Sequence, residues 1–325
     1  MLLSGDLGGT TTRLGLFESV TSRPAPRHTR EFRTTDHAGL SDLLRAFLDE
    51  APLDGQRIEA ACVGVAGPVL DGRATLTNVP WPVGLEEIRD ATSIDRAALI
   101  NDVEAMGYAL PVLTAAEVEV LQAGEPDPGG NAVLLTAGTG LGVSLLRGIG
   151  GRLEPLASEG GHTDFAARDE AEIALVRYLL AAYGRAEAEQ VVSGPGLVNI
   201  ARHVHPDDCP VNDLTGADRD LPPGISRGAL DGTCRFCVEA LTRWVAAFGS
   251  VAGNFALSVV ATGGVYLGGG IPPRILPALR DGTFVRAFRE KPPMDTLLAR
   301  IPITVILEPQ AGLLGAAVRA AQLVL

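Results

Sequence analysis

A segment close to the start of the chain combines a carboxylate, several glycines and three consecutive threonines between two short apolar runs. It reads GDLGGTTTRLGLF, from Gly5 to Phe17. Leucines lead into the segment and alternate out of it, so the glycines and hydroxyls are predicted to lie at a turn between two strands. Glycines there let backbone N–H groups approach an anion without a Cβ in the way. The segment predicts a phosphate site, and an ordinary glycine-rich hairpin is the alternative.

The polar groups of this turn divide between phosphate and metal binding. The predicted phosphate donors are the backbone of Gly8 and Gly9 and the hydroxyls of Thr10, Thr11 and Thr12. The carboxylate of Asp6 can hold a hydrated magnesium ion that shares the phosphate charge.

A second turn of the same kind lies in AVLLTAGTGLGVSLL, from Ala132 to Leu146. Two apolar runs flank Gly138, Thr139 and Gly140, so a nucleotide gripped from two sides is indicated. Neither turn is followed by the Gly-Lys-Ser/Thr of a Walker loop, and neither has the G-x-G-x-x-G spacing that opens a dinucleotide-binding helix. P-loop and Rossmann folds are therefore disfavoured.

Further segments of the chain match one family in the family's own order. They are INDVEAMGYAL from Ile100, EGGHTDFA from Glu159, SGPGLVNI from Ser193, GGVYLGGGIPPR from Gly263 and PQAGLLGAA from Pro309. Together with the two turns, which resemble phosphate motifs one and two of the actin, Hsp70 and sugar-kinase superfamily, they resemble the bacterial glucokinase family. The matching segments span nearly the whole chain.

The resemblance implies an α/β, two-domain, actin-like ATPase fold of the ribonuclease H-like type, with an interdomain cleft. The implied small domain covers residues 1–105 plus about 302–325, and the large domain covers residues 106–301. A chain of 325 residues is long enough for two domains. Strands that alternate with helical stretches such as 40–50 also predict an α/β first half, and a last amphipathic helix is predicted over 312–325.

The resemblance also implies the site residues. Asp102, after a strand-like run, is implied as the general base, and the implied sugar ligands are Asn101, Asp102, Glu159, His162 and Glu189. An N-cap role for Asn101 and Asp102 is the alternative, and the two roles can coexist. Glu187, two residues before Glu189, is the residue most easily confused with it.

The adenosine end is predicted at the GGVYLGGG turn. Gly269 and Gly270 allow a flat nucleoside to lie close to the backbone, and a helix N-terminus after them can face an anion. A buried strand with a glycine-rich turn is the alternative. Asn78 and Trp81 match a family feature near the sugar side and are interpreted as supports rather than ligands.

The composition excludes several classes of protein. With 46% hydrophobic and 20% charged residues the chain is predicted to be globular. A formal charge of −12 argues against nucleic acid or an anionic membrane as partner. No signal peptide or bilayer-length apolar run is found, which predicts a cytoplasmic protein. The resemblance implies a homodimer.

Four cysteines are too few for a disulfide scaffold. Cys234 and Cys237 form a C-x-x-C, but they lie in a helical pattern with Leu241, Trp244 and Val245 on one face, so helix packing is predicted. Related repressor-type sugar kinases carry a cysteine-rich zinc motif after their histidine ligand. No such motif follows His162, and no structural zinc is predicted.

The predicted function is phosphorylation of D-glucose to glucose 6-phosphate by ATP and Mg²⁺, with Asp102 as base. Mannose, fructose or glucosamine as the substrate is the first alternative. A non-catalytic sugar sensor is less favoured, because no DNA-binding segment precedes the first turn. An actin-type or Hsp70-type ATPase is disfavoured by the predicted sugar ligands.

Overall fold

The computed structural model describes residues 1–19, 23–76, 79–205, 209, 214 and 221–324. The chain divides into two compact units, each described here by itself. The first unit comprises residues 1–114, 153–157 and 308–325, and the second comprises residues 115–152 and 158–307. None of the helices among the described residues is both long and apolar enough to cross a membrane.

The first unit is built on a five-stranded sheet of order β3-β2-β1-β4-β8. These strands are β1 (Leu2–Leu7), β2 (Thr11–Glu18), β3 (Ala25–Arg33), β4 (Ala60–Val65) and β8 (Ala97–Asn101), and a small second sheet contains β5 (Val69–Leu70), β6 (Arg73–Ala74) and β7 (Val83–Gly84). Strands β1, β4 and β8 are parallel, and β2 is antiparallel to β1 and β3. The predicted first hairpin is therefore confirmed as β1 and β2.

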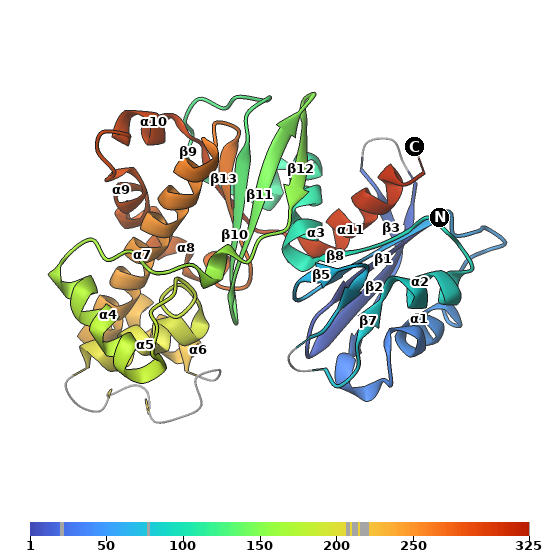
Figure 1. Ribbon diagram of the computed structural model, residues 1–325, viewed down its shortest axis with the longest axis horizontal. Helices are drawn as coiled ribbons and strands as arrows, with labels where there is room; N and C mark the ends of the chain where they lie inside the picture. The colour runs from blue at the N-terminus through green and yellow to red at the C-terminus, as the bar shows by residue number, and fades with distance from the viewer. Residues whose placement is uncertain (20–22, 77–78, 206–208, 210–213, 215–220, 325) are drawn as a thin grey trace. The chain divides into compact units, whose positions relative to one another are not determined.

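Helices cover both faces of this sheet (Figure 1). They are α1 (Leu40–Leu48), α2 (Leu85–Thr92), α3 (Asp102–Ala109) and α11 (Ala311–Gln322). Side chains alternate across a strand, so Leu3 and Leu7 of β1 join the core beneath α1 and α2, whereas the Ser4 hydroxyl donates to the Leu313 carbonyl of α11. The last helix thus packs on the sheet that the first strand begins.

A six-stranded sheet has the order β12-β11-β10-β13-β14-β9, and all of its strands except β12 lie in the second unit. Its strands are β9 (Val118–Gln122), β10 (Ala132–Ala137), β11 (Leu141–Ile149), β12 (Arg152–Leu156), β13 (Gly264–Gly268) and β14 (Ile303–Ile306). Strands β10, β13 and β14 are parallel, whereas β11 and β9 are antiparallel to their neighbours. The second predicted hairpin is confirmed as β10 and β11.

The two sheets repeat one topology. In each, the first strand of a hairpin lies at the centre, with the two later hairpin strands on one side and two parallel strands on the other. The order β3-β2-β1-β4-β8 corresponds to β12-β11-β10-β13-β14. The two sheets thus share one architecture.

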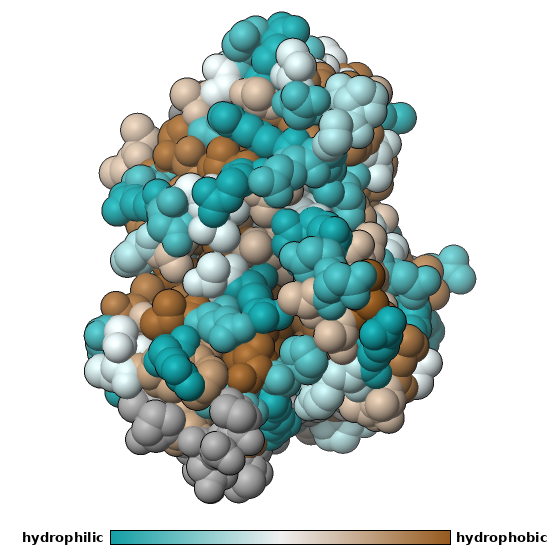
Figure 2. Space-filling view, turned by 90° about the vertical axis from the view of Figure 1, so that its left-hand side faces the viewer, coloured by the Kyte–Doolittle hydropathy of each residue, from teal (hydrophilic) through white to brown (hydrophobic). Residues whose placement is uncertain are grey.

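The helices of the second unit are α4 (Glu170–Tyr183), α5 (Gly194–Val204), α6 (Pro222–Leu230), α7 (Arg235–Val259), α8 (Leu276–Arg280), α9 (Thr283–Arg289) and α10 (Asp295–Arg300). They form one group, in which the long helix α7 contacts α5, α6, α8, α9 and α10, and α4 packs against α5 (Figure 1). Leu241, Trp244 and Val245 of α7 are buried in this unit's core, as the helical pattern predicts. Figure 2 shows hydrophilic side chains interspersed with hydrophobic ones over the face turned to the viewer.

Candidate active site

The first phosphate turn joins β1 to β2 in the first unit. The Gly8 N–H donates to the Thr11 carbonyl over 3.0 Å, and a Cβ on Gly8 would lie 2.9 Å from that same oxygen. The tight turn therefore requires glycine at this position. Thr10 is exposed and Thr11 is half-buried, so both hydroxyls lie where an anion can reach them.

Thr12 differs from its prediction as a phosphate donor. Its side chain is fully buried, and its hydroxyl lies 2.8 Å from the hydroxyl of Thr34, which in turn donates to the Gly8 carbonyl over 2.8 Å. Alternation along β2 turns this residue to the interior while Thr11 faces the other way. Thr12 supports the turn from beneath and is not available to a ligand.

Asp6 lies on β1 directly before this turn. It is opposite Arg13 in the hairpin register, and a Cβ on Gly312 at the start of α11 would lie 3.4 Å from one of its carboxylate oxygens. Burial raises the pKa of Asp6, and the charge of Arg13 lowers it in part. An oxygen ligand beside a phosphate turn suits Mg²⁺, which prefers one or two carboxylates together with phosphate oxygens.

Asn101 and Asp102 lie where β8 ends and α3 begins. The Asn101 side-chain oxygen accepts from the Val103 N–H over 2.8 Å, and its amide donates to the Gly67 carbonyl over 3.0 Å. Glu104 completes a capping box by accepting from the Asn101 N–H over 3.0 Å. Asn101 is therefore the N-cap of α3. Burial raises the pKa of Glu104, against this hydrogen bond and the charge of Arg319, which both lower it.

Asp102 is the first residue of α3, and one of its carboxylate oxygens accepts from the Val103 N–H over 2.9 Å. The predicted capping alternative is thus present, chiefly at Asn101. It leaves the Asp102 carboxylate at the carboxyl end of a parallel strand, where ligands bind in open α/β sheets.

The sheet register brings the phosphate turn and Asp102 to one edge of the first unit. Asp6 pairs with Gly64 of β4, and Gly64 pairs with Ile100 of β8, so Asp6 and Ile100 are two strands apart, about 10 Å. Because Gly64 has no side chain, α3 approaches closely: a Cβ there would lie 3.5 Å from the Asp102 Cα. Asp6 and Asp102 are 96 positions apart in the sequence, and only the strand order brings them to the same edge of the sheet.

The second phosphate turn joins β10 to β11 in the second unit. The Gly138 N–H donates to the Gly140 carbonyl over 2.9 Å, and the Gly138 carbonyl accepts from the Gly194 N–H over 2.8 Å. Gly194 begins α5, whose N-cap Ser193 accepts from the Gly196 N–H over 2.9 Å. Thr139 lies at the tip of this turn and is exposed.

Glu189 is joined directly to the second phosphate turn. One of its carboxylate oxygens accepts from the Leu141 N–H over 2.8 Å, and a Cβ on Gly140 would lie 2.6 Å from the same oxygen. Its backbone N–H donates to the Gly161 carbonyl over 2.9 Å. A Cβ on Gly161 would overlap the Leu141 carbonyl oxygen. The turn, the EGGH segment and the residues before α5 therefore form one connected site within the second unit.

His162 lies beside two acidic residues in this site. It closes a short 3-10 helix, Gly160–His162, and half of its side chain is exposed. Its Nδ1 lies 3.4 Å from a Glu187 carboxylate oxygen, and its Nε2 lies 4.0 Å from a Glu159 oxygen. Glu187 also faces Arg185 at 3.7 Å.

Glu187 and Glu189 both reach His162. One ligand atom from each of the three residues lies within 4.8 Å of the others. From the sequence, Glu187 was considered only as a residue that could be confused with Glu189. The structure shows it as a histidine partner, which the two-residue spacing alone did not indicate.

The GGVYLGGG segment forms β13 and the turn after it. Thr136 of β10 pairs with Gly268 of β13, and Gly269 has φ of +87° and leaves no room for a Cβ against the Ala137 carbonyl. The turn predicted to bind adenosine and the turn between β10 and β11 thus share one edge of the sheet.

The structure corrects the prediction that a helix N-terminus after this turn can face an anion. The turn leads into a 3-10 helix, Pro272–Ile275, and not into a long helix. Its first two residues are prolines, which have no backbone N–H to donate to an anion.

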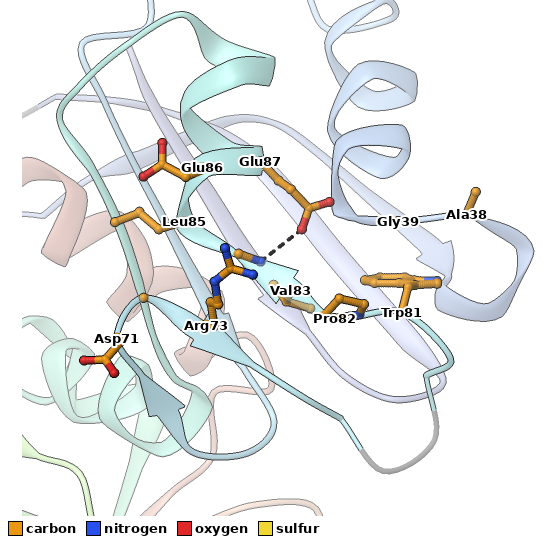
Figure 3. A pocket seen from close by; sticks show the side chains of 12 residues that line it. Ala38, Gly39, Asp71, Arg73, Trp81, Pro82, Val83, Leu85, Glu86 and Glu87 are labelled. Atoms are coloured by element: carbon orange, nitrogen blue, oxygen red, sulfur yellow. Dashed lines mark hydrogen bonds between the residues drawn. The ribbon is translucent and has the colours of Figure 1, made fainter.

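The expected supports on the sugar side fall partly outside the described residues. Asn78 is not among them. Trp81 donates from Nε1 to the His37 carbonyl over 3.0 Å. It lines a pocket of the first unit with Pro82 and Arg73, in which Glu87 accepts from the Gly84 N–H (Figure 3). None of the predicted ligands lines this pocket, and Trp81 was interpreted as a support.

Comparison with known proteins gives a consistent result. A glucokinase family model matches residues 3–323. A glucokinase of Nostoc sp. is 37% identical over 341 residues, covering 99% of this chain and 99% of the relative. The chain also resembles the crystal structure of a glucokinase from an Antarctic psychrotroph, with a TM-score of 0.86 and 29% identity over 99% of this chain and 98% of the other.

A more distant match has ligands in its structure. The structure of a ROK family glucokinase from Streptomyces griseus, in complex with glucose and AMPPNP, matches with a TM-score of 0.65 and 21% identity over 99% of each chain. At this identity the match concerns the fold, and it agrees with the actin-like ATPase fold that the motifs implied.

Proposed function

Since the chain belongs to the glucokinase family and is a glucokinase enzyme, we propose that Asp102 is the general base that activates the 6-hydroxyl of D-glucose. The observation that carries this proposal is the strand register of the first unit, in which Asp102 follows β8 at the same sheet edge as the phosphate turn after β1. A carboxylate at that edge can orient a hydroxyl and accept its proton.

Sugar binding is assigned to the polar side chains of the INDV, EGGH and EQVV segments. The proposed ligands are Asn101, Asp102, Glu159, His162 and Glu189. Support comes from Glu189, whose carboxylate is oriented by the Leu141 N–H, and from the grouping of His162 with Glu189. Asn101 uses its oxygen in the α3 cap and one amide hydrogen in the bond to the Gly67 carbonyl, which leaves its second amide hydrogen for a sugar oxygen.

ATP binding is assigned to the two glycine turns and the segment after β13. The proposed contacts are Gly8, Gly9, Thr10 and Thr11 in the first turn, Gly138, Thr139 and Gly140 in the second, and Gly269 and Gly270 at the adenosine end. The open space around Gly138 and Gly270, where a Cβ would meet no atom within 4 Å, supports these assignments. The glucose and AMPPNP in the Streptomyces griseus protein agree with this choice of ligands.

Asp6 is the residue proposed to hold Mg²⁺, through water. Its carboxylate and its place before the phosphate turn fit a hard cation that keeps several waters. Bound Mg²⁺ would offset the negative charge of the phosphate oxygens.

In the proposed reaction the glucose 6-oxygen attacks the γ-phosphorus in line. The new oxygen–phosphorus bond forms as the bond to the β–γ bridging oxygen breaks, and ADP leaves. Asp102 accepts the hydroxyl proton. The protein's part is positioning and electrostatics, and exclusion of water matters because water competes as nucleophile.

The test is a coupled assay with magnesium ATP across glucose, mannose, fructose, glucosamine and a no-sugar control. A rate confined largely to glucose is the expected result. Phosphorylation of another hexose would keep the mechanism and change the substrate, whereas sugar-independent hydrolysis or no activity would contradict the proposal.

Three further assignments remain proposals. The two compact units are proposed to be the small and large domains, the protein is proposed to be cytoplasmic, and it is proposed to form a homodimer. Light scattering tests the assembly, and a monomer mass at assay concentrations would contradict the dimer.

A further inference from the structure

Three thiols and one imidazole converge in the second unit, away from every residue assigned to sugar or nucleotide. They belong to Cys209, Cys234, Cys237 and His205, and one ligand atom of each lies within 4.8 Å of all the others. The Cys209 sulfur lies 3.9 Å from that of Cys234 and 3.6 Å from that of Cys237. The Cys234 sulfur lies 3.5 Å from the His205 Nε2.

We propose that these four residues bind one Zn²⁺ ion in a tetrahedral Cys₃His site that stabilises the helical part of the second unit. Thiolate-rich sets with one imidazole select zinc among the common divalent metals. Binding requires the thiolate form, so the thiol protons pass to solvent as the sulfur–zinc bonds form.

The separations of the ligand atoms fit this metal. Sulfur atoms at about 2.3 Å and nitrogen at about 2.0–2.1 Å from a tetrahedral zinc lie about 3.5–3.8 Å from one another. The separations given above, from 3.5 to 3.9 Å, match the edges of such a tetrahedron. Packing alone requires no such common spacing among four polarisable or polar atoms.

His205 is oriented as a metal ligand would be. Its Nδ1 lies 2.7 Å from the Ala201 carbonyl, so Nδ1 carries the proton that this hydrogen bond needs. The other nitrogen, Nε2, then presents its lone pair toward Cys234. A backbone carbonyl that fixes the tautomer through the far ring nitrogen is the usual outer support of a zinc-bound histidine.

The ligands come from separate parts of the chain. His205 follows the last turn of α5, Cys234 is the N-cap of α7, and Cys237 lies in the first turn of α7. Cys209 lies between His205 and Cys234 in the sequence, and its side chain is buried. A metal here would tie the end of α5 to the start of α7 (Figure 1).

The same two helices support the candidate active site at their other contacts. The Trp244 Nε1 of α7 donates to the carbonyl of Ser193, the N-cap of α5, over 3.0 Å. Ser193 directly precedes Gly194, which bonds Gly138 of the second phosphate turn. The proposed role of zinc is therefore to stabilise this helix pair and not to take part in the reaction.

Cys62 provides a contrast within the same chain. None of the four cysteines forms a disulfide, but Cys62 lies in β4 of the first unit and belongs to neither candidate metal group. Burial raises the pKa of its thiol to about 12. It is a packing cysteine and a matched control.

The sequence predicted helix packing for Cys234 and Cys237. It predicted no structural zinc because no cysteine-rich motif follows His162. His205 and Cys209 lie outside that pattern, 24 residues separate Cys209 from Cys234, and no local spacing indicated the group.

The first experiment measures zinc in untagged protein by elemental analysis after growth in zinc-containing medium. About one zinc per chain is expected in the wild type and in Cys62→Ala, with at least a tenfold loss in the Cys234→Ser/Cys237→Ser double variant. The proposal would be overturned if the wild type holds no zinc after it has been supplied with the metal, or if the double variant holds as much zinc as the wild type.

A second set of measurements needs no variant and so does not depend on the variant folding. Wild-type protein loaded with Co²⁺ should show the thiolate-to-cobalt charge-transfer bands of a tetrahedral site, and a thiol-specific mercurial should release the metal as three thiols react. Zinc removal by a chelator should lower the unfolding temperature by about 5–10 °C. An absent cobalt–thiolate spectrum, or a disulfide between two of these cysteines in freshly purified protein, would contradict the site.

Discussion

At the scale of single residues, Asp102 combines a minor part in capping α3 with the proposed role of general base. Asn101 performs most of the capping of α3, whereas Asp102 contributes one carboxylate oxygen to the Val103 N–H. An amide oxygen can replace that acceptor but cannot take a proton from a sugar hydroxyl.

Asp102→Asn is therefore expected to lower kcat by about a hundredfold to ten-thousandfold while glucose binding is largely kept. The coupled assay measures the first quantity and calorimetric glucose binding the second. Unchanged turnover would show that Asp102 is not the base, and loss of both would indicate damage to the α3 cap.

The two glutamates near His162 can also be separated. Glu189 is oriented by the Leu141 N–H beside the phosphate turn, whereas Glu187 faces His162 and Arg185. We expect Glu189→Gln to raise the KM for glucose by about 10- to 100-fold, because a hydrogen bond to a charged acceptor is weakened. The isosteric Glu187→Gln variant should have the smaller effect. A larger effect for Glu187→Gln would transfer the ligand role to that residue.

At the scale of elements, the close approach of α3 and α11 depends on glycine. A Cβ on Gly315 would overlap the Ala105 carbonyl oxygen, which belongs to the backbone of α3 and cannot rotate away. Both helices lie on the sheet that contains the first phosphate turn. Their spacing therefore influences Asp6, which lies beside Gly312 of the same helix.

Gly315→Ala is expected to lower the free energy of unfolding by about 1–3 kcal/mol, since overpacking forces the helices apart. Urea unfolding checks this value. Gly129→Ala is the matched control, because its Cβ would meet only the Asp127 side chain at 3.7 Å, an ordinary contact. Equal stability of the two variants would disprove the packing constraint.

At the scale of the whole molecule, the described residues form two separate hydrophobic cores. One is formed by β1, β2, β4, α1 and α2, and the other surrounds α7 and the second sheet. Each core contacts one of the two tryptophans. Trp81 packs against the first core, and Trp244 is fully buried in the second.

Separate cores predict unfolding that is not a single two-state transition. In Trp81→Phe, fluorescence reports Trp244 alone, whereas far-UV circular dichroism reports helices of both units. The two urea curves are expected to have different midpoints in the absence of ligands. Superimposable curves in this variant would show that the two cores unfold together.

Much of the fold was predictable because its signals are local. The hairpins β1–β2 and β10–β11 follow from alternating apolar residues around glycine turns, and α1 and α7 follow from helical periodicity. Thr12 was predicted wrongly as a phosphate donor, since its hydroxyl is bonded to that of Thr34, 22 residues later in the chain.

The sequence by itself determined the family, the two phosphate turns and the position of Asp102 at the end of a strand. These depend on residue types at short spacing, where local sterics and hydrogen bonding set the conformation. Only the tertiary structure decided which groups come together: Asp6 and Asp102 at one edge of the sheet, on either side of β4, Glu187 beside His162, and His205 with Cys209, Cys234 and Cys237. Such contacts depend on strand order and helix packing over long separations, which no local pattern encodes.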